Sequence, residues 1–385
     1  IDRIHLVYYL HRSLYKIVNK ISLEFGKDYS GLRSKIGSVL LIDDLGKISS
    51  SAIEEYVGDQ GIASEKIRGV MLVQPGFSWQ ANKPTRMPLG LMYIASLVQK
   101  NFPDIDVSIV DMSAERIGIE GLLRRIDEEK PAIVGISLVS VFFGMGKDMA
   151  GAIKNRYPEI LIVAGGPHPS ALPEYTLRSA DFDVVVIGEG EEVFCQLVRA
   201  FSQGNTFHEI KGIYFKENNK ILGSMPILSG YDINKLPPPA LSLNLLRLDR
   251  YDDILEGELV YPIIASRGCF YKCAFCGEKD IFSYHRLRNA EAVVDEIEFV
   301  YHNYAISFFH FLDDTFTANQ ECAKRISNLI IKIKLPIKWM AMTRADAIVS
   351  RLSPSYDYSK ERELLRLAKE SGCVSLAIGV ESGDR

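Results

Sequence analysis

The chain has 385 residues, which is too long for one ordinary hydrophobic core and predicts two or three domains. Hydrophobic residues make up 47% of the sequence and charged residues 24%, proportions that exclude a disordered, collagenous or fibrous chain. The formal net charge of -4 provides no overall basic field, so we expect no nucleic-acid partner.

The sequence also argues against a membrane span and against secretion. Its longest uncharged stretch, residues 131–146, contains glycines and serines and is shorter than the ~20 apolar residues that cross a bilayer. The first residues do not form a basic segment followed by an apolar core and a cleavage site. Three scattered cysteines have the apolar surroundings typical of buried thiols, namely Cys195, Cys322 and Cys373. We therefore expect a reducing, cytoplasmic location.

Residues 1–66 mix aromatic and aliphatic side chains with serine and glycine, and their first part has the pattern of an amphipathic helix. This N-terminal segment carries no motif that indicates a function. The chain begins with Ile1 and stops at Arg385 immediately after a predicted strand, so both ends look cut.

From Gly69 onward, short apolar runs alternate with longer periodic segments such as residues 89–101 and 120–130. Five runs predict buried strands, at residues 69–75, 105–111, 132–139, 160–166 and 182–190. This alternation predicts an α/β domain over residues 67–205, with a doubly wound, Rossmann-like or flavodoxin-like parallel sheet covered on both faces. Ligands of such sheets bind beyond the carboxyl ends of the strands, where the loops begin at Gln74, Asp111, Ser137, Gly165 and Gly188.

Residues 206–250 predict a hairpin followed by a linker. Asn218 and Asn219 are typical of a hairpin turn, while Pro237–Pro239 predict a stiff, extended connection and a domain boundary. Over residues 251–385 the β/α alternation restarts. Strands are predicted at residues 258–268, 306–314, 337–346 and 374–383, with helices at 290–303, 319–334 and 360–372. Polar residues gather where these strands end, as they do in parallel β/α barrels.

Three cysteines follow the first strand of this second half within "SRGCFYKCAFCGEKD", namely Cys269, Cys273 and Cys276. Thiolates this close on a turn can converge on one metal centre. Zinc with His285 as a fourth ligand is one alternative, although no second Cys-x-x-Cys is present. A disulfide is a weaker alternative, because three thiols are an odd number. Three protein ligands to an iron–sulfur cubane would leave one iron open for a substrate or cosubstrate.

The loop "CFYKCAFC" resembles the signature of radical S-adenosylmethionine (SAM) enzymes. The later motifs "FLDDTFT", "WMAMTRAD" and "IGVESG" are similar in order to the branch of that superfamily with an N-terminal cobalamin-binding domain, and the resemblance covers about residues 69–385. It implies a partial (β/α)6 radical SAM barrel. It also implies a [4Fe-4S] cluster on Cys269, Cys273 and Cys276, whose open iron SAM chelates before an electron cleaves it to a 5′-deoxyadenosyl radical.

The same resemblance implies residues that bind SAM, namely Phe275, Asp313, Asp314, Arg344 and Glu381. Phe275 would pack beside the adenine, and the two aspartates would contact the methionine amino group. Arg344 and Asp346 would hold the carboxylate or ribose, and Glu381 the polar groups of the cosubstrate.

Structural alternatives exist for these residues. A double aspartate is also a common helix N-cap, and an arginine–aspartate pair such as Arg344 with Asp346 is often merely structural. For Arg267, in the same loop as the cysteines, we favour a loop-stabilising guanidinium.

In the first half, "SLV" and "GGPHPS" resemble the cobalamin-binding pattern. The resemblance places cobalamin against Ser137, Leu138, Val139, Gly165, Gly166, Pro167, His168, Gly188 and Glu189. Adjacent glycines permit close backbone approach to a bulky ligand, but a plain tight turn is the alternative. "GEGEE" at residues 188–192 does not favour a dinucleotide, because carboxylates crowd the place of a pyrophosphate and a third glycine is missing. Its acids would then simply stabilise a helix terminus.

The loop after the first strand, "QPGFSWQANKPTRMPLG", contains no histidine to bind cobalt. We therefore expect residues 138–142 to cover the lower face of the corrinoid and His168 to be a polar contact. A domain that has lost its corrinoid is the alternative.

The resemblance implies a cobalamin-dependent radical SAM methyltransferase acting on an unactivated carbon or phosphinate centre, with its two domains facing each other across the substrate. The expected partners are a small-molecule substrate and an external one-electron reductant such as flavodoxin or ferredoxin. One alternative is radical cyclisation, oxidation or rearrangement on the same architecture. Another is a non-catalytic corrinoid- or zinc-binding module. The sequence does not name the substrate.

Overall fold

The computed structural model describes residues 69–76, 86–225, 232–251, 258–277, 284–349 and 357–379. The expectations for residues 1–66 and for Glu381 lie outside these described residues. Both sheets described below belong to one compact unit, Ser64–Arg385.

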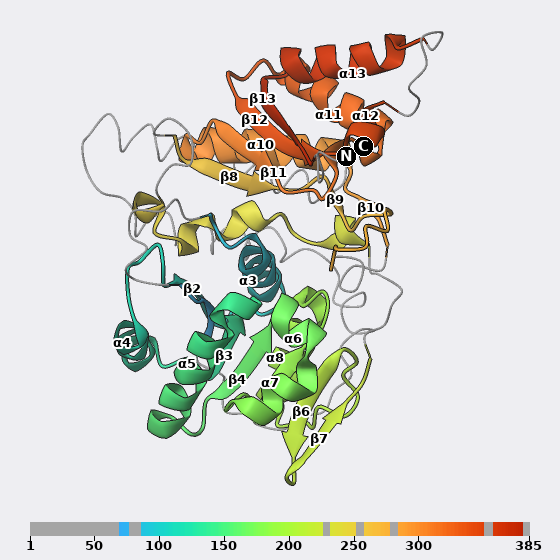
Figure 1. The fold of residues 1–385 in the computed structure, drawn as a ribbon. Helices are drawn as coiled ribbons and strands as arrows, with labels where there is room; N and C mark the ends of the chain where they lie inside the picture. Colours follow the sequence, from blue (N-terminus) through green and yellow to red (C-terminus); the bar gives the residue numbers. More distant parts are fainter. Residues whose placement is uncertain are drawn as a thin grey trace, which may run out of the picture. The chain divides into compact units, whose positions relative to one another are not determined.

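The first sheet has seven strands in the order β2-β1-β3-β4-β5-β6-β7 (Figure 1). Their bounds are β1 (Gly69–Gln74), β2 (Asp106–Asp111), β3 (Ile133–Ser137), β4 (Leu161–Gly165), β5 (Val184–Val186), β6 (Ile213–Glu217) and β7 (Lys220–Gly223). Strands β1 to β5 are parallel in the flavodoxin-like order, so the predicted doubly wound sheet is confirmed. Its five parallel strands are the five apolar runs identified from the sequence.

Helices cover both faces of this sheet. They are α3 (Leu89–Asn101), α4 (Ile119–Glu129), α5 (Phe143–Arg156), α6 (Pro167–Ala171), α7 (Pro173–Ser179) and α8 (Glu191–Ser202), with a 3-10 turn, η3 (Ser140–Phe142), before α5. Successive strand residues point to opposite faces. Val70 and Leu72 of β1 therefore pack with α3 and α8, whereas Met71 and Val73 pack with α4 and α5. A strand buried on both faces shows an unbroken apolar run, which is why these strands were predictable.

The hairpin of β6 and β7 is present, and Asn218 and Asn219 both have the positive φ that its turn requires. It is not a separate connection, because β6 pairs antiparallel with β5 and extends the first sheet. The expected extended linker ends at Pro238, since Pro239 begins a 3-10 helix, η5 (Pro239–Leu245). Two shorter turns flank it, η4 (Ile233–Lys235) and η6 (Leu248–Arg250).

The second sheet has four parallel strands in the order β13-β12-β11-β8. These are β8 (Val260–Ile263), β11 (Phe308–Phe311), β12 (Lys338–Thr343) and β13 (Cys373–Ile378). They alternate with α10 (Ala290–Tyr304), α11 (Gln320–Ile333) and α13 (Ser359–Glu370), and short turns η7 (Phe316–Ala318) and α12 (Ala345–Ile348) follow β11 and β12. Sequential parallel strands joined by helices confirm the β/α architecture predicted for a partial barrel.

A two-stranded ladder, β9 (Ser266–Arg267) with β10 (Arg286–Leu287), lies between β8 and α10 and was not predicted. It pairs Arg267 with Arg286 and so brings together the residues on either side of the cysteine loop. Two residues per strand are too few to show a period, which is why the sequence pattern missed this ladder.

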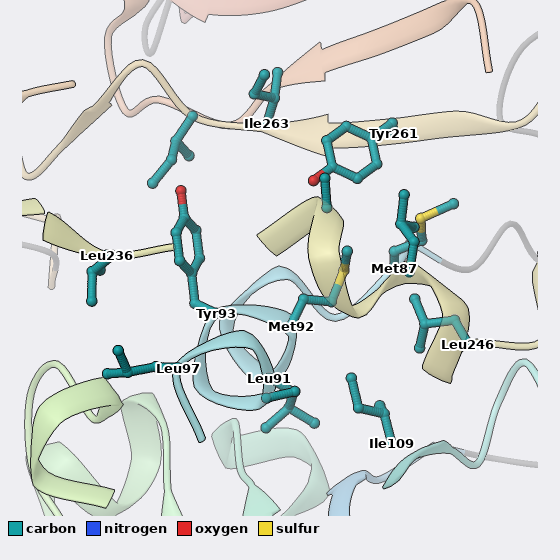
Figure 2. Close-up of a cluster of buried hydrophobic side chains, with 14 of the residues drawn as sticks. Met87, Leu91, Met92, Tyr93, Leu97, Ile109, Leu236, Leu246, Tyr261 and Ile263 are labelled. Carbon is teal, nitrogen blue, oxygen red and sulfur yellow. The ribbon is translucent and has the colours of Figure 1, made fainter. Parts of the chain in front are cut away.

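One continuous hydrophobic core joins the two sheets. It includes Leu72 of β1, Met92 of α3, Leu243 of η5 and Phe309 of β11. Figure 2 shows α3 side chains facing both the η5 region and the strand that carries Tyr261. The fully buried Ser242 hydroxyl lies 2.9 Å from the Pro239 carbonyl oxygen and 3.1 Å from that of Met92, so η5 is in direct contact with α3. The predicted domain boundaries therefore fall within a segment that shares this core, and they remain predictions.

None of the helices in the described segments has the length and hydropathy needed to cross a membrane.

Candidate functional site

A cavity of about 360 Å³ lies where the carboxyl ends of strands from both sheets meet. The first half contributes the loops after β3, β4 and β5 together with the first turns of α3. The second half contributes Ile264, Ser266, Arg267, Gly268, Leu312 and Asp314. Much of the wall is apolar, including Leu72, Leu91 and Phe194. Strand-end loops of two parallel sheets therefore face one space, as the sequence predicted.

The predicted cobalamin residues divide into two groups. Six of them line the cavity, namely Ser137, Gly165, Gly166, Pro167, Gly188 and Glu189. Leu138, Val139 and His168 do not. Leu138 is fully buried in the core beneath β3, and Val139 is partly exposed. The expected cover over a corrinoid by residues 138–142 stays a prediction.

The two glycines after β4 serve different purposes. Gly166 has a φ of 98° and a ψ of -174°, and an added Cβ would lie 2.8 Å from the Leu138 carbonyl oxygen. The tight-turn alternative therefore accounts for Gly166, since only glycine adopts this backbone readily. Gly165 is different, because a Cβ there would meet no atom within 4 Å. Gly165 thus leaves open space on the cavity wall for close approach of a ligand.

His168 is buried beside this turn. Its Nδ1 lies 3.1 Å from the Ser140 hydroxyl, and its ring stacks on Phe143 with centroids 4.2 Å apart. Burial lowers the pKa of His168, so the imidazole is neutral at ordinary pH. Since it does not line the cavity, its predicted polar contact with a ligand remains untested.

The cysteine loop follows β9 directly. Cys269, Cys273 and Cys276 are half-buried free thiols, and the Cys276 backbone N–H donates to the Cys273 carbonyl at 3.2 Å. Within the described residues, no three cysteine, histidine or carboxylate side chains are close enough to hold a metal ion. Three free thiols on one turn nevertheless fit the donor set of an iron–sulfur cluster with one open iron. Binding such a group would require the thiols to turn towards one another.

Arg344 connects this loop to the end of β12. Its Nη1 lies 3.1 Å from Cys273 Sγ, and its guanidinium carbon lies 4.1 Å from the centroid of the Tyr271 ring. The same side chain donates to both carboxylate oxygens of Asp346, at 2.9 and 2.8 Å. The predicted Arg344–Asp346 pair is therefore present, and it contacts the cysteine loop. The side chain of Phe275 is 73% exposed and makes no part of the cavity wall.

The two predicted aspartates face different ways. Asp313 is 2% exposed and accepts from the Ala265 backbone N–H at 2.9 Å and the Ser266 hydroxyl at 2.5 Å. Burial raises the pKa of Asp313 to about 6. Asp314 lines the cavity, and burial raises its pKa as well. The N-cap alternative is wrong, because Asn319 caps α11 by accepting from the Cys322 backbone N–H at 2.9 Å.

The acids after β5 are ion-paired rather than free for a ligand. Glu189 contacts Arg286 and lies 3.6 Å from Arg267, while Glu191 accepts from Arg267 at 2.5 Å. The favoured structural role for Arg267 is therefore supported. The pairing of Glu189 is a finding that the cobalamin pattern did not anticipate.

Two notable polar residues were missed by reasoning from strand ends. Tyr93 on α3 lines the cavity with its ring 4.6 Å from the Arg267 guanidinium, and burial raises its pKa to about 12. His310 on β11 is 3% exposed, and burial lowers its pKa to about 4. His310 does not line the cavity, although it lies on the strand that leads to the lining residues Leu312 and Asp314. The only available signal was a histidine inside an otherwise apolar strand.

Two family models match the chain, one in each half. The family model described as B12 binding domain matches residues 85–198, and the one described as Radical SAM superfamily matches residues 263–385. The chain belongs to the radical SAM enzymes with an N-terminal B12-binding domain. The resemblance stated from the sequence motifs is thereby confirmed.

Relatives of this radical SAM chain include two curated proteins. "Uncharacterized methyltransferase PH0819" of Pyrococcus horikoshii is 32% identical over 322 residues, covering 82% of this chain and 66% of the relative. The "Anaerobic magnesium-protoporphyrin IX monomethyl ester cyclase" of Cereibacter sphaeroides is 26% identical over 284 residues, covering 72% of this chain and 44% of the relative. The chain thus spans only part of the length of these relatives.

Among solved structures, the fold is similar to that of the radical S-adenosylmethionine methyltransferase TsrM from Kitasatospora setae, which was solved with cobalamin and a [4Fe-4S] cluster bound. The TM-score is 0.63 at 20% identity, covering 82% of this chain and 59% of TsrM. This likeness confirms the two-part radical SAM fold.

Proposed function

We propose that this protein is a cobalamin-dependent radical SAM methyltransferase that methylates an unactivated carbon or phosphinate centre of a small molecule. The observation that carries the proposal is the cavity shared by the strand ends of the two sheets. A methyl donor held by the first half and a radical generated in the second half must both reach one substrate, and this cavity is lined by both halves. The names of the Pyrococcus relative and of TsrM, both called methyltransferases, support methyl transfer.

The residues of the chain have distinct tasks in this scheme. Cys269, Cys273 and Cys276 would hold a [4Fe-4S] cluster, and Gly165 and Gly188 would lie against cobalamin. When bound, the cluster and SAM supply a 5′-deoxyadenosyl radical, and cobalamin supplies a transferable methyl group. Asp314 would contact SAM from the cavity wall. The apolar side chains around the cavity would exclude water from reactive species.

The proposal also includes an external one-electron donor such as flavodoxin or ferredoxin, a cytoplasmic location and the absence of a nucleic-acid partner. The roles of Phe275, Arg344 and Glu381 in SAM binding, and of Leu138, Val139, Pro167 and His168 beside cobalamin, belong to the same proposal.

A second candidate function is radical cyclisation, oxidation or rearrangement. The observation that favours it is the match to the Cereibacter cyclase over 284 residues. A non-catalytic corrinoid- or zinc-binding module is the candidate of another class. Metal analysis distinguishes this module from the enzyme, because the module would take up zinc or no metal in place of iron.

The test is anaerobic reconstitution of the purified protein with iron and sulfide, followed by addition of reductant and SAM. We expect a brown protein that releases 5′-deoxyadenosine. Formation of S-adenosylhomocysteine as well indicates methyl transfer, whereas turnover without it indicates the cyclase type. A colourless protein, or one that contains only zinc, contradicts the proposal.

Cys273→Ala is the matched variant. Removing one of three cluster ligands should abolish release of 5′-deoxyadenosine, because the remaining thiols cannot hold the cubane with a single open iron. Product is measured by chromatography, with Cys322→Ala on α11 as the control that retains activity. Cleavage by Cys273→Ala at the control rate would remove Cys273 from the cluster.

A further inference from the structure

Two arginines beside the cysteine loop are held by two glutamates of the first sheet. Arg267 Nη2 lies 2.5 Å from Glu191 Oε1, and Arg286 Nη1 lies 3.0 Å from Glu189 Oε2. Arg267 also lies 3.6 Å from Glu189, so the four side chains form one cluster. Their side chains are between 6% and 17% exposed. We call these four residues the arginine bracket.

The bracket lies between the two parts of the cavity wall. Glu189 belongs to the loop after β5 and Glu191 is the first residue of α8, and both line the cavity together with Gly188. Both arginines belong to the ladder of β9 with β10, whose first strand is followed at once by Gly268 and Cys269. The bracket therefore connects the residues after β5 to the start of the cysteine loop.

Further buried groups hold the chain just before the cysteine loop. Arg288 donates to Glu296 at 2.6 Å and to the Ile264 carbonyl at 2.9 Å, while Asp313 accepts from Ala265 and Ser266. These contacts hold residues 264–266, directly before Arg267. The bracket adds contacts to the Arg267 side chain, two residues before Cys269.

Stability alone does not account for four buried charges. Desolvation of a buried ion pair costs about as much as the attraction returns, so well-packed apolar residues often serve stability equally well. What an arginine–carboxylate pair provides is a fixed direction, because the planar guanidinium donates along set vectors. The bracket is thus suited to positioning.

We propose that Glu189 and Glu191 are positioning residues that hold the backbone at the start of the cysteine loop, from which its thiols can turn onto a cluster and retain it, and that they couple ligand binding beside the β5 loop to cluster retention. This inference rests on the proposed function. Coupling between sites is reciprocal in binding free energy, so a corrinoid that favours this arrangement of the β5 loop also strengthens binding of the cluster. Stronger binding appears mainly as slower dissociation, here as slower loss of iron.

The first measurement is the rate at which a chelator removes iron from reconstituted protein. In Glu189→Gln/Glu191→Gln, loss should be about fivefold faster or more, because a change in affinity at the lower end of the usual coupling range appears mainly in the rate of dissociation. The electron paramagnetic resonance spectrum of the reduced cluster should broaden, which a merely structural role would not cause. The control is Glu174→Gln, which breaks an exposed pair with Arg178 on α7.

The second measurement adds hydroxocobalamin as the probe. It should slow iron loss from the wild-type protein and leave the rate in the double variant unchanged. Arg267→Lys, which keeps the charge but loses the planar fork, should behave like the double variant at an unchanged thermal midpoint. If the double variant does not fold, Arg267→Lys replaces it in both measurements.

The outcomes separate the two proposals. If the wild-type protein takes up no iron, the proposed function and the bracket both fail. If the wild-type protein takes up iron and responds to hydroxocobalamin, and the variants match it in rate, spectrum and response, only the bracket fails.

Discussion

At the scale of single residues, burial determines what each polar group can do. Asp313 and Asp314 are neighbours in one motif, yet Asp313 ties β8 to β11 from inside the core and Asp314 lines the cavity. The sequence motif could not distinguish them, because adjacent residues at a strand end differ only in the direction of their side chains. The sequence did place Ser137, Gly165 and Gly188 at the cavity, since their location follows from the strand order alone.

Asp313→Asn should change how stability depends on pH. The folded pKa of about 6 lies above the ordinary value of 3.8, so the folded protein binds more protons than the unfolded chain between these values. This contribution to the free energy of unfolding is present below pH 3.8 and is lost as the pH rises through about 6. The loss amounts to at most about 3 kcal/mol for a shift of this size.

Urea unfolding of both proteins at intervals between pH 4 and pH 7 measures this effect. The stability of the wild-type protein relative to Asp313→Asn should fall across this range. A constant difference between the two proteins would show that folding does not raise the pKa of Asp313.

At the scale of elements, length and burial decide what a sequence reveals. Strands β1 to β5 were predictable, because each is an apolar run bounded by turn residues. The linker was predicted less well, since three prolines favour an extended chain only until Pro239 starts η5 on the buried face of α3. The ion pairs of the bracket were invisible, because they join residues about 80 to 100 positions apart that no local pattern relates.

Gly166→Ala should destabilise the turn between β4 and α6. Its backbone lies in a region that is essentially restricted to glycine, at a cost of about 1–3 kcal/mol for any other residue. The added Cβ would also press on the Leu138 backbone. Thermal unfolding measures the loss.

Gly144→Ala on α5 is the matched control. A Cβ there meets no atom within 4 Å, and alanine in a helix is favoured over glycine by up to about 1 kcal/mol. Equal effects of the two substitutions would contradict the role assigned to the turn.

At the scale of the whole molecule, the two sheets share one hydrophobic core through α3 and η5. We therefore expect the described region to unfold in a single calorimetric transition. Met92→Ala truncates a fully buried side chain of α3. It should lower the free energy of unfolding by about 2–5 kcal/mol and leave a single transition. Two transitions, of which Met92→Ala moves only one, would show that the halves are energetically independent.

The packing of η5 against α3 also limits how a bulky ligand can enter the cavity. Many two-lobed enzymes open like a clamshell about a flexible hinge. Such a swing would expose Ala240, Ser242 and Leu243, all of them fully buried, to solvent. Entry must then depend on rearrangement of loops at the rim, so the radius of gyration from small-angle X-ray scattering should be nearly the same before and after hydroxocobalamin is added.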